Sequence, residues 1–220
     1  MSQAEKVSMN QDINETDNKT SQTDAFRVIG ITGGIGTGKS RVLDCLKEIP
    51  GAVVLEADRL AKELYEPDRR GYEPVLAYFG PEILMVDGRI DRSILGSIVF
   101  ADTEKLTVLN EIMHPLVKEE ILETIDHTKK SGARFFFLEA ALLLQDGYRD
   151  ICDEIWYIHA DRETRLRRLM AGRGIDREKA GRVMQNQPSE EWYRERTDLE
   201  IDNSGNFTAT EKQIRAALKI

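Results

Sequence analysis

Residues 33–40, GGIGTGKS, constrain this chain more than any other feature, because they fit the pattern G-x-x-x-x-G-K-[ST]. Glycines allow positive φ angles and close backbone approach, so successive N–H groups can surround a phosphate at the start of the following helix. The apolar run 28–31 predicts a buried strand before the loop, and Val42, Leu43 and Leu46 have helical spacing after it. The order of strand, loop and helix argues against a chance match in a glycine-rich turn and predicts a nucleotide phosphate site.

The pattern gives the last residues of this loop separate roles. Lys39 is expected to reach the β- and γ-phosphates, and the Ser40 hydroxyl is expected to bind Mg²⁺. The other predicted nucleotide contacts in this stretch are Gly34, Gly36, Thr37, Gly38 and Arg41.

Composition favours a single globular domain with a small anionic ligand. The chain has 220 residues and is 40% hydrophobic, which is enough for one core. Its net charge is −8 and it has no basic run, so we expect no nucleic-acid partner. Cys45 and Cys152 lack a C-x-x-C context, which predicts two reduced, packed thiols and no zinc site.

The first 24 residues are polar and carry no signal-peptide core, and no 18 apolar residues run together anywhere. We therefore expect a disordered tail at 1–24, a folded domain at 25–220, no membrane contact and a cytoplasmic location. Composition leaves the oligomeric state open between a monomer and a weak homo-oligomer.

Four further strands are expected, at 52–55, at 134–139 as the central strand, at 154–159 and at 199–202. Helical patterns separate them, and residues 59–130 are mostly helical. Strands that alternate with helices predict a five-stranded parallel α/β sheet covered on both faces. Asp58 follows the second strand, where it could accept a hydroxyl proton from a substrate or, alternatively, cap the helix 59–64.

The residues around the loop favour a small-molecule kinase over a switch. N-K-x-D is absent, and the only D-x-x-G lies near the end at 202–205. Arginines crowd the segment after the fourth strand, where a mobile lid could stabilise the charge that develops in phosphoryl transfer. We expect this role for Arg168 and Arg173, with Gly172 and Gly174 as hinges; the alternative is a basic amphipathic helix with Leu166, Leu169 and Met170 packed inward. That segment's other arginines are Arg162, Arg165, Arg167 and Arg177.

Later motifs resemble the dephospho-CoA kinase family from about Arg27 to the C-terminus. They are EAD at 56–58, DGRIDR at 87–92, HPL at 114–116 and IDNSG at 201–205, in addition to TGGIGTGKS at 32–40. The resemblance implies a three-layer P-loop fold of adenylate-kinase type, with a helical substrate insert at about 59–130 and a lid at about 165–195. It also implies transfer of the ATP γ-phosphoryl group, with Mg²⁺, to the 3′-hydroxyl of dephospho-CoA, the last step of coenzyme A synthesis.

The resemblance implies further site residues. Asp58 becomes the expected base and Arg168 the expected transition-state arginine, while Asn203 is an expected nucleotide contact. Glu139, Arg92 and His114 are expected on the acceptor side, where His114 contacts substrate or has a structural role; for Arg92, a salt bridge within the insert is the alternative to a phosphate contact. Another small-metabolite or nucleotide kinase, or a non-catalytic ATP-binding regulator, is the alternative function.

Some positions depart from the family pattern. Glu139 and Glu56 stand where aspartate is common, Ala141 and Gln145 replace a proline and a glutamate, and Arg165 replaces a frequent glutamine. The spacing from Arg168 to Arg173 is also one residue longer than usual. Because Lys39, Ser40, Asp58, Arg92 and His114 are retained, we expect an active enzyme.

Overall fold

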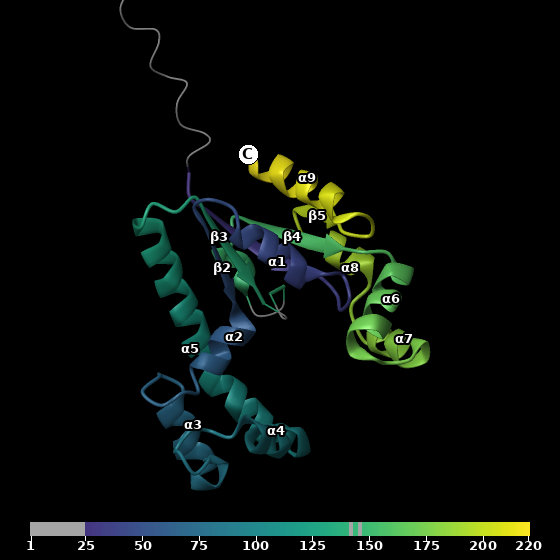
Figure 1. Ribbon diagram of the computed structural model, residues 1–220. Coiled ribbons are helices and arrows are strands. Elements are labelled where there is room, and N and C mark those ends of the chain that lie inside the picture. Colours follow the sequence, from purple (N-terminus) through teal and green to yellow (C-terminus); the bar gives the residue numbers. More distant parts are fainter. Residues whose placement is uncertain (1–24, 141–142, 145–146) are drawn as a thin grey trace, which may run out of the picture.

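A parallel five-stranded sheet forms the centre of the computed structural model, which describes residues 25–140, 143–144 and 147–220 (Figure 1). The predicted tail at 1–24 and the departures at Ala141 and Gln145 lie outside these residues. The strands are β1 (Arg27–Thr32), β2 (Ala52–Glu56), β3 (Phe135–Glu139), β4 (Glu154–His159) and β5 (Leu199–Asp202). Their order is β2-β3-β1-β4-β5, with every pairing parallel. The predicted sheet is confirmed, but β1 is the central strand and the expectation that 134–139 is central was wrong.

Helices follow each strand. They are α1 (Lys39–Lys47), α2 (Ala57–Glu63), α3 (Tyr72–Phe79), α4 (Arg92–Ala101), α5 (Thr103–Lys130), α6 (Arg162–Arg173), α7 (Arg177–Gln185), α8 (Glu190–Arg194) and α9 (Phe207–Leu218), with short 3₁₀ turns η1 (Pro81–Ile83) and η2 (Tyr148–Ile151). Aspartates at N-cap positions start α4, α5, α6 and α7 by accepting backbone N–H bonds in the first turn. These caps explain why polar, charged segments begin helices at defined residues.

Alternate side chains of β3 enter two different cores, as expected for a strand buried on both faces. Phe136 and Leu138 pack with the helices α2 to α5, whereas Phe135 and Phe137 pack against α1 and α9. The sheet is therefore the middle of three layers, and the predicted fold class is confirmed.

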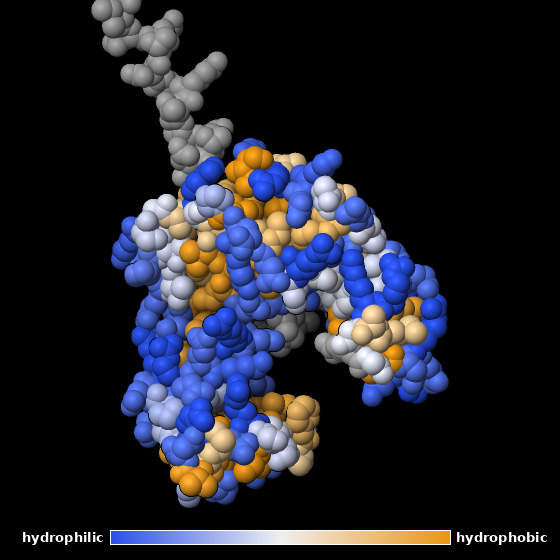
Figure 2. Space-filling view, in the orientation of Figure 1, coloured by the Kyte–Doolittle hydropathy of each residue, from blue (hydrophilic) through white to orange (hydrophobic). Residues whose placement is uncertain are grey.

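Two helical arms leave the carboxyl edge of the sheet (Figure 1). The α2–α4 arm follows β2 and returns through the long helix α5, which contains Pro115; the second arm, α6 and α7, follows β4. Figure 2 shows that the surface is hollowed between these arms. In an open parallel sheet, ligands bind at this carboxyl edge, so the hollow is the expected position of a ligand site.

Cys45 and Cys152 are both free and partly buried, and burial raises the pKa of Cys152 to about 12, so it is a neutral thiol at physiological pH. Among the described residues, no helix is long and apolar enough to cross a membrane.

The sheet core gives a direct stability prediction. Phe137 is fully buried, with its ring centroid 6.0 Å from that of Trp156, so Phe137→Ala should lower the free energy of unfolding by about 3–5 kcal/mol. Urea unfolding measures this loss. Phe100→Ala is the matched control, since Phe100 is 91% exposed and its truncation should cost less than about 0.5 kcal/mol. Equal losses in both variants would contradict the assignment of the core.

Candidate active site

The loop between β1 and α1 has the backbone shape that a phosphate cradle needs. Gly38 has φ +89°, and a Cβ there would lie 2.4 Å from Asn203 Nδ2. Gly33 also has positive φ, and a Cβ there would lie 2.5 Å from the carbonyl oxygen of Ile158. Buried Thr37 braces the turn by donating from Oγ1 to the Gly34 carbonyl at 2.9 Å. Any side chain at Gly33 or Gly38 would therefore displace this loop.

Lys39 is the charge at the centre of the site. Its Nζ donates to the Gly33 carbonyl at 2.7 Å, across the loop. Burial lowers the pKa of Lys39; the Glu139 carboxylate opposes this shift, Arg165 adds to it and Asp58 opposes it. These couplings place Lys39, Asp58 and Glu139 in one electrostatic group, so the structure brings together three of the predicted residues.

The two carboxylates of this group come from neighbouring strand ends. Glu139 ends β3 opposite Glu56 of β2, and Asp58 lies in the first turn of α2 with an exposed side chain. Burial raises the pKa of Glu139, Lys39 lowers it, and Asp58 and Glu56 raise it. The alternative role for Asp58 as a helix cap was wrong, because α2 begins at Ala57 and Glu56 occupies the N-cap position.

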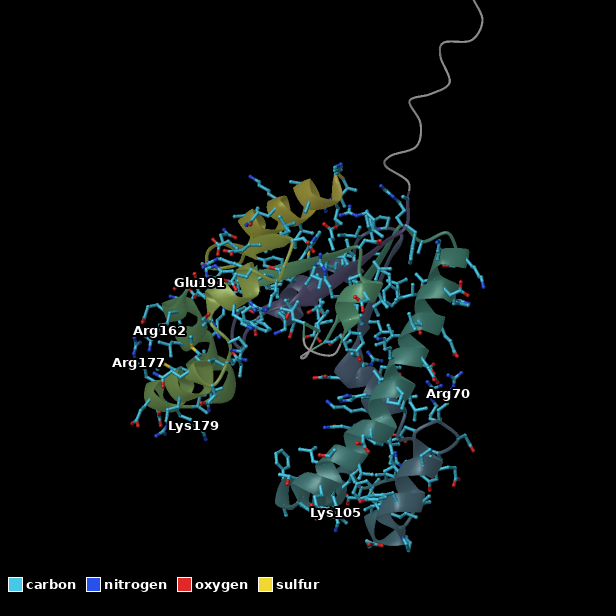
Figure 3. The ribbon with its side chains drawn as sticks, turned by 180° about the vertical axis from the view of Figure 1, so that it is seen from behind. Arg70, Lys105, Arg162, Arg177, Lys179 and Glu191 are labelled. Atoms are coloured by element: carbon cyan, nitrogen blue, oxygen red, sulfur yellow. The ribbon has the colours of Figure 1, made fainter. Side chains whose placement is uncertain are left out.

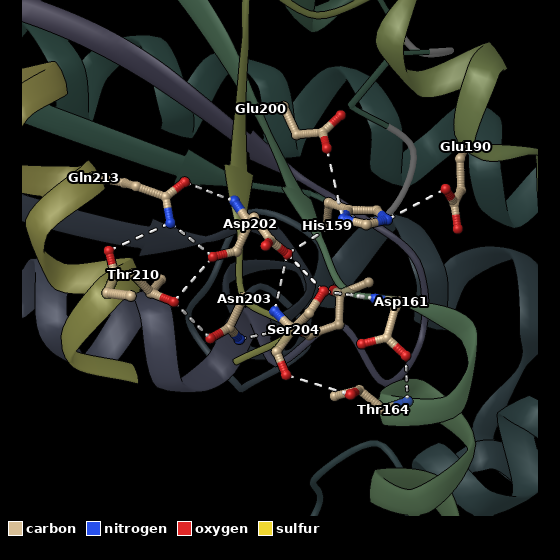
Figure 4. Close-up of polar contacts among 12 residues, drawn as sticks. His159, Asp161, Thr164, Glu190, Glu200, Asp202, Asn203, Ser204, Thr210 and Gln213 are labelled. Carbon is tan, nitrogen blue, oxygen red and sulfur yellow. Dashed lines mark hydrogen bonds and ion pairs between the residues drawn. The ribbon is translucent and has the colours of Figure 1, made fainter. Parts of the chain in front are cut away.

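Arg168 and Asn203 contact the loop from the side of its carbonyl groups. Arg168 Nη1 donates to the Thr37 carbonyl at 2.9 Å, and its Nη2 donates to the Asn203 carbonyl at 2.7 Å. Asn203 is buried, donates from Nδ2 to the same Thr37 carbonyl at 2.8 Å and accepts from Thr210 (Figure 4). Burial lowers the pKa of Arg168, and the neighbouring cations Arg167 and Arg41 lower it further, whereas Asp161 raises it.

The other predicted site residues lie on the helices α1, α4, α5 and α6. The Ser40 side chain is exposed at the second position of α1, and the guanidinium of Arg41 lies 4.0 Å from the centroid of the Phe207 ring. Arg92 begins α4 and is exposed; it forms no salt bridge within the described residues, so the proposed ion pair in the insert was wrong. His114 is exposed on α5, and the side chain of Arg173 lies outside the described part.

The arginines of α6 and α7 divide into two groups. Figure 3 shows Arg162 and Arg177 on the outer side of this arm, where both are exposed and pair with Glu163. Leu166 and Leu169 pack inward as expected, but Met170 is 40% exposed and its inward placement was wrong. Arg165 is buried against the loop, where it donates to the Ile35 carbonyl. The sequence did not predict this contact, although Arg165 and Arg168 are three residues apart and therefore lie on one face of the helix.

His159 was the second residue missed. It ends β4 opposite Asp202 of β5, and its Nε2 lies 3.2 Å from Glu190 while its Nδ1 lies 3.5 Å from Glu200 and 3.4 Å from Asp202 (Figure 4). Burial raises the pKa of Asp202, but bonds from Ser204 and His159 outweigh it and leave that pKa lowered. This cluster fastens α8 to the sheet edge.

The fold and the phosphate loop define a P-loop kinase class of protein. The family model of dephospho-CoA kinase matches residues 27–209. The chain belongs to this family, as the motifs predicted.

Similar proteins agree with that assignment. A dephospho-CoA kinase of Carboxydothermus hydrogenoformans is 41% identical over 193 residues, covering 87% of this chain and 93% of the relative. One from Geobacter sulfurreducens is 39% identical over 189 residues, covering 86% and 95%. The crystal structure of TT1252 from Thermus thermophilus superimposes with TM-score 0.70 at 32% identity, covering 89% of this chain and 97% of that one. A shikimate kinase from Acinetobacter baumannii, at TM-score 0.50 and 15% identity, shares the fold.

The electrostatic group around Lys39 gives a pH prediction. Since the Glu139 carboxylate raises the pKa of Lys39, Glu139→Gln should let Lys39 lose its proton more easily. The alkaline limb of kcat/KM for ATP, which reports the free enzyme, should then move to lower pH. Glu48→Gln, at the far end of α1, is the control and should leave the limb in place. An unmoved limb in Glu139→Gln would contradict the coupling.

Proposed function

We propose that this chain transfers the γ-phosphoryl group of ATP to the 3′-hydroxyl of dephospho-CoA, giving coenzyme A and ADP. The observation that carries the proposal is the group of Lys39, Asp58 and Glu139 at the carboxyl edge of the sheet, beside a phosphate loop and between two arms. The family assignment supports the choice of acceptor, and the geometry supports the roles proposed for the residues.

Lys39 and the loop amides bind the ATP phosphates in this proposal. The ammonium of Lys39 is partly buried and has a lowered pKa, so it gains from a phosphate whose charge replaces the solvent that Lys39 has lost. Each terminal nitrogen of Arg168 donates one hydrogen bond, to the carbonyl of Thr37 and to that of Asn203. The remaining guanidinium N–H groups are available to phosphoryl oxygens. Its role is to stabilise charge that develops during transfer.

The residues present also fit Mg²⁺. The exposed hydroxyl of Ser40 is next to Lys39 in the sequence, and the Asp58 and Glu139 carboxylates act on the same ammonium, so the oxygen ligands that Mg²⁺ prefers are available on this side of the loop. When bound, the ion would neutralise phosphate charge. Asp58 accepts the proton of the acceptor hydroxyl or orients that hydroxyl for in-line attack. Its side chain is exposed on the first turn of α2 and is therefore accessible to substrate.

Arg92, His114 and Glu139 are proposed to contact the acceptor. Arg92 is exposed and close enough to Tyr65 to lower that residue's pKa against the rise caused by burial, so a cation is available on the insert for an acceptor phosphate. We also propose cytoplasmic action on this small molecule, with no nucleic-acid or membrane partner.

A coupled assay of ADP release tests the acceptor. Dephospho-CoA, AMP, shikimate and gluconate are supplied in turn with ATP and Mg²⁺, and only dephospho-CoA should support rapid turnover. ADP formation with AMP but not dephospho-CoA would identify another metabolite kinase. Tight ATP binding without any acceptor-dependent ADP would identify a regulator.

Asp58 gives the most direct mechanistic prediction. Asp58→Asn should retain ATP binding and lower kcat by about 10²- to 10⁴-fold, because the amide cannot accept the hydroxyl proton. Lys39→Ala should instead lower ATP affinity and rate together. Steady-state kinetics and a binding titration separate the two effects, and full activity of Asp58→Asn would exclude the proposed base.

Arg168 and Arg167 form a matched pair on α6. Arg168→Ala should lower kcat far more than it raises the KM for ATP if its charge acts mainly in the transition state. Arg168→Lys keeps the charge without the planar fork and should also lose activity. Arg167 is exposed, so Arg167→Ala should be almost silent. The opposite ranking of Arg167→Ala and Arg168→Ala would contradict the assignment.

A further inference from the structure

In the phosphate loop, both backbone polar groups of Ile35 are hydrogen-bonded to side chains from α6 and from the segment after α7. Ile35 accepts from Arg165 Nε at 2.9 Å through its carbonyl, and its N–H donates to Gln187 Oε1 at 2.8 Å. Arg165 Nη2 closes the ring by donating to the same Gln187 Oε1 at 2.9 Å. Three polar contacts therefore link α6, the loop and the segment between α7 and α8.

The side chains of Arg165 and Gln187 lie against Gly34, the residue before Ile35. A Cβ on Gly34 would lie 2.5 Å from Arg165 Nη2 and 2.9 Å from Gln187 Oε1. A side chain at Gly34 would therefore displace the ends of Arg165 and Gln187, which together are here called the clasp. The loop and the clasp fit each other as one unit.

Arg165 also carries a charge that the described residues do not neutralise. It is 7% exposed, and within the described chain it forms no ion pair with a carboxylate. It also lowers the pKa of Lys39, and both side chains donate to carbonyls of the same loop. A buried cation without a counter-ion is costly, and a polyphosphate bound in the loop would offset that cost for Arg165.

The far side of the clasp is anchored. Glu190, three residues after Gln187, contacts His159, and the ring of Tyr193 stacks on Tyr157 at 4.8 Å with parallel planes. The near side borders a cavity of about 270 Å³ lined in part by Arg162, Met184 and Pro188. Because this side is not tightly packed, the clasp depends on its hydrogen bonds.

We propose that Arg165 and Gln187 are positioning residues for ATP, which hold the phosphate loop in its binding shape from the lid side. The inference rests on the proposed kinase function but concerns residues outside the transfer step. Arg165 supplies positive potential and one bond to Ile35, and Gln187 fixes the amide of the same residue. Since loop shape serves ground state and transition state alike, loss of the clasp should act on ATP affinity more than on kcat.

The test variant is Gln187→Leu, which has similar volume but no acceptor. It leaves the Ile35 N–H and one Arg165 N–H without a partner, so the Kd for a non-hydrolysable ATP analogue and the KM for ATP should both rise about tenfold. The KM for dephospho-CoA should stay within about twofold and kcat within about threefold. Gln185→Leu is the control, since Gln185 is exposed and two residues away, and it should match the wild type.

Arg165→Lys is the second variant, because it keeps the charge and the stem but cannot donate to both partners in a fork. It should also raise the Kd, and the double variant with Gln187→Leu should lose no more than about the larger single effect, since the residues act as one unit. Thermal melting separates these losses from unfolding.

The outcomes are distinct. The proposed role of the clasp would be overturned if neither Gln187→Leu nor Arg165→Lys raised the Kd for the ATP analogue relative to Gln185→Leu. Equal rises in the KM for both substrates, together with a lowered Tm, would also overturn it. Additive losses in the double variant would also overturn it. Wild-type protein that binds the analogue but shows no dephospho-CoA-dependent ADP would instead defeat the proposed function, and the binding titration would still test the clasp.

Discussion

The outward-facing carbonyl groups of the phosphate loop are the constraint on which the site depends. A loop that directs N–H groups toward a phosphate must direct carbonyl groups away from it, and buried carbonyls need donors. Donors are present for each carbonyl from residue 33 to residue 37: Lys39 for Gly33, Thr37 for Gly34, Arg165 for Ile35, and Arg168 and Asn203 around Gly36 and Thr37. The helix α6 and the turn after β5 are thus part of the loop's own architecture.

The topology explains why the donors from outside the loop come from one side. β1 is central, with β3 and β2 on one side and β4 and β5 on the other, so the loop after β1 lies where the strand order changes direction. The donors from outside the loop, Arg165, Arg168 and Asn203, follow β4 and β5. The carboxylates Asp58 and Glu139 instead lie at the ends of β2 and β3. The nucleotide side and the acceptor side of the proposed site are therefore separated by the sheet order itself.

Local patterns in the sequence predict the strands and the phosphate loop, because apolar runs and glycine positions reflect short-range constraints. The grouping of Lys39 with Asp58 and Glu139 follows from parallel strand ends, so it is also accessible from sequence. Arg165, Gln187 and His159 were missed because their partners lie far along the chain: Arg165 is 130 residues from Ile35, and Gln187 is 152 residues from it. The sequence alone does not separate a buried arginine from an exposed one, because the partner that buries it is brought near only by the fold.

The same argument explains why an acidic protein has a cationic site. The net charge is −8, yet Lys39, Arg165 and Arg168 gather at one loop because each satisfies a backbone carbonyl as well as supplying charge. Burial lowers the pKa of Lys39 and of Arg168, so both cations have lost solvation that a bound anion would compensate. Hydrogen bonds to the backbone keep these side chains in place before nucleotide arrives, which reduces the ordering cost of binding. Preorganisation of the cradle and its affinity for phosphate thus come from the same contacts.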